Sequence, residues 1–176
     1  MNHVTPIALV GMLAIMTSVA EAQDRHVAIE AAIGLVPPVG IFADRYEAGV
    51  HAAVGLERRN PGSHVGWRVE GTWDDFSPKY GGRDNHARAG SLTANGTLTL
   101  TPPRFTAVGL YAIGGVGYYN TRESALFHGT QSDIGFNGGG GLRFRIGAVR
   151  LYVEGRLHDI PVAQMYFVPL TLGVAF

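Results

Sequence analysis

The sequence contains no cysteine, which excludes disulfide bonds, thiolate metal ligands and a lipid-anchored N-terminal cysteine. Charged residues make up only 16% of the chain, and Lys79 is the only lysine among 14 basic residues. Soluble proteins usually present many lysines and glutamates to water. The formal net charge is zero, so the chain lacks the basic surface that nucleic-acid binding requires.

Long apolar runs are also missing, apart from one short stretch near the N-terminus. Residues 7–16 are apolar, but they are too few to span a bilayer as a helix. They are followed by Ala20-Glu21-Ala22, the small-residue pattern of a cleavage site. We predict a secretory signal peptide over residues 1–22, and a single domain over residues 23–176. The alternative is an uncleaved anchor helix.

No segment has sustained helical periodicity, and period-two alternation recurs instead. Turn-forming Gly, Pro, Asn and Asp separate eight runs, each long enough to cross a bilayer as a tilted strand of about 10 residues. The fifth run is apolar on both faces, so its phase stays open. The runs are residues 26–36, 49–58, 65–74, 91–101, 105–119, 133–145, 149–158 and 167–176.

The links between the runs alternate in length. The first, third, fifth and seventh are long or moderate, and the second, fourth and sixth are tight. Transmembrane barrels have this pattern, with long outer loops and short periplasmic turns. We therefore expect an all-β fold: an eight-stranded antiparallel up-and-down transmembrane β-barrel.

The polar face of the runs carries five carboxylates and five guanidinia, a balance that a closed polar interior needs because an unpaired buried charge is costly. Arginine suits such pairs because its planar fork meets a carboxylate at two atoms. Aromatic residues near strand ends, including Trp73, Tyr118, Phe144 and Phe176, favour a bilayer interface on the apolar face. The predicted interior residues are Glu30, Glu57, Arg68, Glu70, Asp74, Arg143, Arg145, Arg150, Glu154 and Arg156.

The segments "LYAIGGVGYYN", "IGFNGGGGLRFRI", "VRLYVEGRLHDI" and "FVPLTLGVAF" resemble the small outer-membrane β-barrel proteins of Gram-negative bacteria, the porin-like group that includes the transmembrane domain of outer-membrane protein A. The resemblance implies that Phe176, ending an alternating strand, is the signal read by the barrel-assembly machinery. It also implies periplasmic N- and C-termini. No peptidoglycan-binding domain is expected after Phe176.

The sequence gives little support for a catalytic site or a metal site. His158 and Asp159 adjoin at one strand end, and Ser124 and His128 lie in one loop, but no catalytic motif of an outer-membrane lipid A-modifying enzyme or protease is present. His86 near Asp84 does not make a metal site. We expect no enzyme activity, no metal and no cofactor.

The predicted function is structural or surface-interacting, for a monomer in the outer membrane in contact with lipid and lipopolysaccharide. The loop with Lys79, Tyr80, Arg83, His86 and Arg88 is a candidate for lipopolysaccharide phosphates or a host partner. Eight strands leave room only for side chains, so a salt-bridged plug is favoured over a narrow porin-like channel for small solutes. A soluble periplasmic lipocalin-like carrier, with the apolar face inside, is the further alternative.

Overall fold

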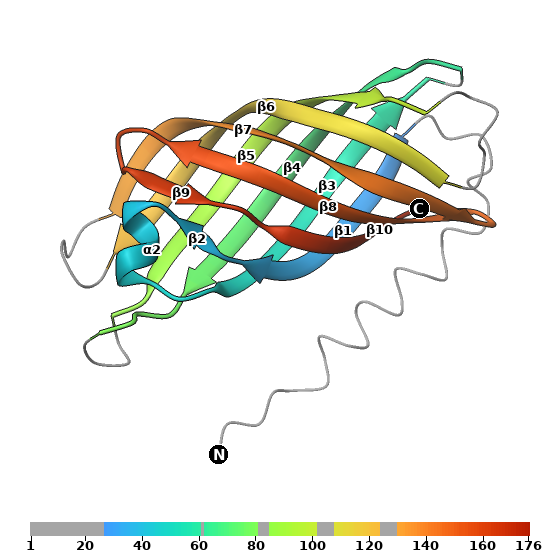
Figure 1. Cartoon of the computed structure of the whole chain (residues 1–176). Helices are drawn as coiled ribbons and strands as arrows, with labels where there is room; N and C mark the ends of the chain where they lie inside the picture. The colour runs from blue at the N-terminus through green and yellow to red at the C-terminus, as the bar shows by residue number, and fades with distance from the viewer. Residues whose placement is uncertain (1–26, 61, 81–84, 102–107, 124–129) are drawn as a thin grey trace, which may run out of the picture.

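The computed structural model describes residues 27–60, 62–80, 85–101, 108–123 and 130–176, which form an antiparallel barrel (Figure 1). The predicted signal peptide lies outside these residues. The elements in chain order are β1 (Val27–Val36), β2 (Pro38–Val39), α2 (Ile41–Arg45), β3 (Gly49–Arg59), β4 (Val65–Phe76), β5 (Ala87–Thr99), β6 (Val108–Glu123), β7 (Thr130–Ile146), β8 (Val149–Ile160), β9 (Met165–Phe167) and β10 (Leu170–Ala175).

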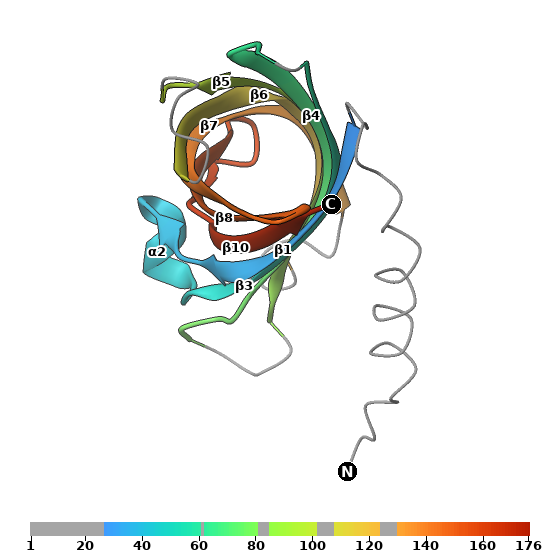
Figure 2. The same cartoon turned by 90° about the vertical axis from the view of Figure 1, so that its right-hand side faces the viewer.

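Eight strand positions close into a ring, which Figure 2 shows end-on. Strand β1 pairs with β3, strands β3 to β9 pair in chain order, and β10 pairs with both β8 and β1. The short β2 and β9 continue β1 and β10 in one register, since Leu35 lies opposite Leu170 and Pro38 lies opposite Phe167. Pro169, which has no N–H to donate, lies between β9 and β10. The predicted closed eight-stranded antiparallel barrel is confirmed.

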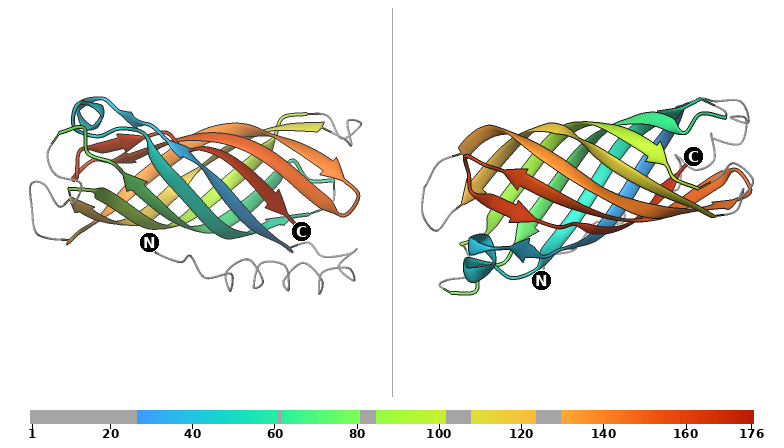
Figure 3. Two further views of the ribbon diagram at one scale, coloured as in Figure 1. Left: turned by 90° about the horizontal axis from the view of Figure 1, so that it is seen from below. Right: turned by 45° about the horizontal axis from the view of Figure 1, so that its top comes forward.

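The two ends of the barrel differ. The start of β1 and the end of β10 lie together at one end, here called the termini end, and α2 lies at the opposite end, here called the helix end (Figures 1 and 3). Connections 37–48, 77–86, 124–129 and 161–164 follow strands that run to the helix end. Connections 60–64, 100–107 and 147–148 lie at the termini end.

Two features differ from the prediction. Strands β6 and β7 have 16 and 17 residues rather than about ten, because the polar segments beside the long loops continue the hydrogen-bonded ladder. The predicted tight link after the fourth run falls mostly on residues 102–107, which lie outside the described residues. The first long loop contains the five-residue helix α2, and no helix in the described ranges is long and apolar enough to cross a membrane.

Side chains alternate between the lumen and the outer wall, as the period-two pattern predicted. The outer wall is apolar and exposed, with Ile33 at 66% and Leu172 at 59%, whereas Glu154 and Arg156 are 2% and 3% exposed. The fifth run, whose phase was open, places Tyr111 in the lumen and leaves Tyr118 exposed. This arrangement is the reverse of a soluble lipocalin-like barrel, whose interior is apolar.

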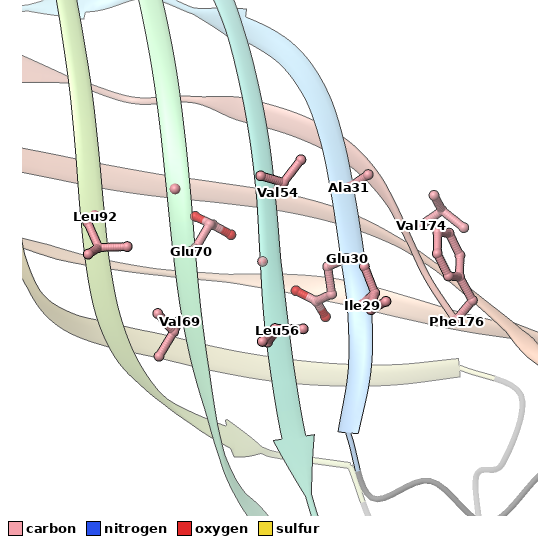
Figure 4. Close-up of a pocket in the computed structure, with 12 residues that line it drawn as sticks. Ile29, Glu30, Ala31, Val54, Leu56, Val69, Glu70, Leu92, Val174 and Phe176 are labelled. Carbon is pink, nitrogen blue, oxygen red and sulfur yellow. The ribbon is translucent and has the colours of Figure 1, made fainter. Parts of the chain in front are cut away.

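The outer wall carries a shallow apolar groove, shown in Figure 4. It has a volume of about 490 Å³ and is lined from five adjacent strands. The side chains of Ile29, Leu56 and Leu92 contribute to it, at positions that are 46%, 46% and 61% exposed. Glu70 also lines the groove, but its carboxylate is bound in the lumen. The rest of the groove lining is apolar and is part of the apolar outer wall.

Candidate functional site: the polar interior

Arg68 of β4 is the centre of the polar interior. Its side chain is fully buried, and its Nε lies 2.6 Å from Glu30 Oε2 while its Nη1 lies 2.9 Å from Glu154 Oε2 and 3.5 Å from Glu70 Oε2. The guanidinium carbon also lies 5.1 Å from the centroid of the Tyr152 ring, a distance at which a cation is attracted to the ring face. One guanidinium thus joins carboxylates from three strands across the lumen.

Arg156 of β8 forms the second centre. It pairs with Glu70 through Nη2, and its Nε lies 2.7 Å from Glu154 Oε1. The Tyr111 hydroxyl donates a 2.5 Å hydrogen bond to Glu154 Oε2. Charge-assisted hydrogen bonds of this kind are stronger than neutral ones. Glu154 therefore has three partners, which hold β4, β6 and β8 together from inside.

A further cluster lies nearer the termini end. Arg143 Nη2 lies 2.5 Å from Glu57 Oε1, and Arg150 Nη2 lies 3.4 Å from Glu57 Oε2. The Arg143 guanidinium carbon lies 3.8 Å from the centroid of the Tyr111 ring. The buried ion pairs thus contain four glutamates and four arginines, which are Glu30, Glu57, Glu70, Glu154, Arg68, Arg143, Arg150 and Arg156.

Polar pairs without arginine occupy the next level toward the helix end. His51 Nδ1 lies 2.7 Å from Asp74 Oδ1, and the Tyr119 hydroxyl lies 2.8 Å from His158 Nδ1. The hydroxyls of Thr72 and Ser91 are 2.7 Å apart. Sequence reasoning missed these pairs; the inward phase of His51 and His158 on their strands was the available signal.

An apolar cluster fills the lumen at the helix end. Phe42 of α2 packs edge-to-face on Phe76, with ring centroids 4.9 Å apart, and Phe76 contacts Phe167 at 5.4 Å. Val36 and Ile160 are the last residues of β1 and β8, face the lumen, and have no exposed surface. Sequence reasoning missed this cluster: Phe76 and Ile160 lie just beyond predicted runs, and Val36 and Phe167 are terminal residues of theirs.

Glycines lie beside several bulky side chains of the interior and leave room for them. A methyl group on Gly173 would collide with the Tyr152 ring, and one on Gly141 would lie 2.8 Å from the Tyr111 hydroxyl. The glycines of "GGGG" in β7 alternate like other strand residues, so Gly139 and Gly141 face the lumen. They allow close approach of interior groups.

The structure places the ten predicted interior residues as follows. Eight are buried, Arg150 is partly buried, and Arg145 is exposed at the termini end. Asp74 pairs with His51 rather than with an arginine. Phe176 is half-buried and exchanges backbone hydrogen bonds of 2.9 and 3.0 Å with Ile29, and its role in assembly remains a prediction.

Among the described residues, the candidate catalytic and metal residues do not form a site. His158 points into the lumen, and the adjacent Asp159 lies on the opposite face of β8, so the two do not pair as a dyad. Ser124, His128, Arg83 and Asp84 lie outside the described residues. In the described ranges no group of three His, Asp or Glu side chains could hold a metal ion.

No family model and no curated protein matches the chain. Solved structures share its fold. Neisserial surface protein A (NspA) is 11% identical, with a TM-score of 0.66, over 86% of this chain and 96% of that chain. The N-terminal β-barrel domain of Pseudomonas aeruginosa OprF is 13% identical, with a TM-score of 0.53, over 86% and 98%. Ail of Yersinia pestis is 15% identical, with a TM-score of 0.51, over 85% and 94%. The chain thus has the fold of the small eight-stranded outer-membrane barrels.

Proposed function

We propose that this chain is an integral outer-membrane protein with a structural and surface-interaction role and a closed, ion-paired interior. One observation carries the proposal: the middle of the exposed wall is apolar around the ring, while the charges of the central ion-pair network are buried in the lumen. Ile134 is 68% exposed on β7 and Val54 is 66% exposed on β3, whereas Arg68 is fully buried. An exposed apolar surface of this extent marks contact with a membrane or a partner, and a closed ring satisfies the backbone hydrogen bonds that hydrocarbon cannot.

The interior favours a plug over a channel. Eight strands leave an interior just wide enough for side chains, and here the lumen holds both the ion pairs and the apolar cluster around Phe76. An ion crossing the barrel would have to pass the Arg68 centre and then the apolar cluster around Phe76, where its desolvation is expensive. Slow passage of small solutes is therefore the weaker alternative.

The proposed orientation puts the termini end in the periplasm and the helix end outside the cell. An even number of strands returns the chain to the side where it began, and Trp67 and Trp73 lie toward opposite ends of the same strand on the outer wall, 43% and 45% exposed. Tryptophan is enriched at both membrane interfaces. Phe176 would present the last strand to the assembly machinery, and the barrel would be a monomer because its edges are closed.

The proposed surface partner is lipopolysaccharide. Arg88 and Arg122 lie directly opposite each other on β5 and β6, and both are exposed on the outer wall near the helix end. Asp75 binds Arg88 at 3.1 Å and His86 at 2.7 Å, so its single carboxylate serves both groups. Like charges directly opposite destabilise a sheet, and a lipid phosphate would relieve the repulsion.

Cell fractionation tests the membrane assignment. The protein should require detergent for extraction and should migrate differently on gels before and after boiling, because the folded barrel resists unheated detergent. Recovery in the osmotic-shock extract would instead favour a soluble carrier. Purified protein in planar bilayers should give no conductance steps, and regular steps would favour the channel.

A further inference from the structure

The mouth of the barrel at the termini end has more positive than negative charge. Arg59, Arg143, Arg145 and Arg150 all occupy inward positions on β3, β7 and β8, and Arg145 lies directly opposite Arg150. Glu57 is the only carboxylate among the described residues that is paired with this group. Four guanidinia and one carboxylate leave a charge of +3 at this mouth.

The ion pairs deeper in the lumen compensate only part of this charge, since Glu30, Glu70 and Glu154 with Arg68 and Arg156 carry a charge of −1. The nearest carboxylate toward the middle, Glu30, is bound to Arg68. Arg59 reaches Thr99 through a 3.2 Å hydrogen bond to a neutral hydroxyl. In the described residues, Arg145 has no ion pair. A positive excess of +2 therefore remains when the mouth and the deeper ion pairs are taken together, and it lies at the mouth.

A buried donor points to a ligand at the same place. Arg143 is 7% exposed, and its Nη1 has no hydrogen-bond partner although its Nη2 is bound to Glu57. Leaving a buried charged donor unsatisfied costs free energy. Glu57 of β3 binds both Arg143 of β7 and Arg150 of β8, so the two guanidinia lie around one carboxylate near the mouth.

We propose that this mouth is a binding site for a phosphate-bearing anion. Guanidinia bind phosphate at two atoms through parallel hydrogen bonds, and several around a partly enclosed mouth raise the local concentration of anions. The phosphate belongs either to a free solute or to a lipid headgroup folded over the rim, since both present the same oxygens. Only the compartment, the periplasm, rests on the proposed orientation.

The chain offers a matched control for the test. Arg58 and Arg59 are adjacent, but Arg58 is on the outer wall while Arg59 is in the lumen. Glutamine at either position removes the same formal charge, and neither arginine has an ion pair within the described part of the chain. Arg59→Gln and Arg145→Gln should therefore fold, which unheated gel mobility checks for each variant.

Refolded protein in an uncharged detergent is titrated with inorganic phosphate, with pyrophosphate and with a short-chain phosphatidylglycerol, and its thermal midpoint is recorded. We expect phosphate or pyrophosphate to stabilise wild type and Arg58→Gln equally, with affinity weakened about tenfold in Arg59→Gln and Arg145→Gln. The two lumen variants should also be more stable than wild type without the anion, because repulsion at the mouth falls.

Two results separate the sources of phosphate, and one overturns the proposal. Stabilisation by phosphatidylglycerol alone would identify a lipid headgroup, and stabilisation by the inorganic anions would identify a solute. Equal responses of Arg58→Gln, Arg59→Gln and wild type to every probe would show that the mouth has no site. Because the titration is done in detergent, this outcome is independent of whether the protein proves to be an outer-membrane component.

Discussion

Replacing Arg68 by methionine should destabilise the barrel by about 3–5 kcal/mol, the usual cost of removing one partner from a buried ion pair. Glu70 and Glu154 would keep Arg156 as a partner. Glu30 has no other guanidinium in the ion pairs of the described residues, so its carboxylate would stay buried and unpaired. The expected loss lowers the folding equilibrium constant by about two to four powers of ten.

Urea titration of protein refolded in micelles or vesicles would measure this loss. Trp67 and Trp73 are the only tryptophans, and both lie on the outer wall. Their emission therefore reports loss of the apolar surroundings as the barrel unfolds. Arg58→Met is the matched control, since an arginine outside the lumen without an ion pair should change stability by no more than about 0.5 kcal/mol.

Charge balance provides a second check. The wild-type network has four glutamates and four arginines, Arg68→Met leaves four and three, and adding Glu30→Gln restores three and three. The double variant should recover at least half of the lost stability. The reasoning is refuted if Arg68→Met behaves like Arg58→Met, or if the double variant is no more stable than the single one.

Three further substitutions test the rest of the interior. Phe76→Ala should cost about 3–5 kcal/mol in the same titration, because it opens a cavity in a fully buried aromatic cluster. Tyr111→Phe should cost about 1.5–3 kcal/mol, since it removes a hydrogen bond to a carboxylate. Gly173→Val should abolish heat-modifiable gel mobility because the new side chain collides with Tyr152, whereas Gly138→Val should fold, since a Cβ there meets its nearest atom at 4.0 Å.

The division into wall and lumen was predictable because alternation has one period in every strand and because the polar face holds nearly equal numbers of Glu and Arg. The ion partners were not predictable. Arg68 and Glu154 are 86 residues apart in the chain, and they meet only when the ring closes with a particular stagger. Residue type alone makes the pairs Arg68–Glu154 and Arg156–Glu70 plausible. The register of the closed barrel is what brings these residues together.

The alternation of apolar and polar residues does not predict the facing of side chains in the fifth run or at the helix end. Tyrosine suits both a polar lumen and a membrane interface, so Tyr111 and Tyr118 look alike in sequence although they face opposite ways. At the helix end, Phe76 and Ile160 are apolar and inward, which breaks the rule that apolar means outward. Phe42 comes from a loop that gave no helical signal.

Two barriers in series close the lumen, and this makes a distinct prediction for conductance. The apolar cluster at the helix end excludes water. The ion pairs lie nearer the termini end and fill the section of the lumen that water could otherwise enter. Phe76→Ala with Phe167→Ala should leave planar bilayers silent, and so should the charge-balanced pair Arg68→Met with Glu30→Gln. Only the combination of all four changes should produce steps. Conductance in the first pair alone would mean that the ion-paired section already admits ions, and conductance in the second alone would mean that the aromatic cluster does not seal the helix end.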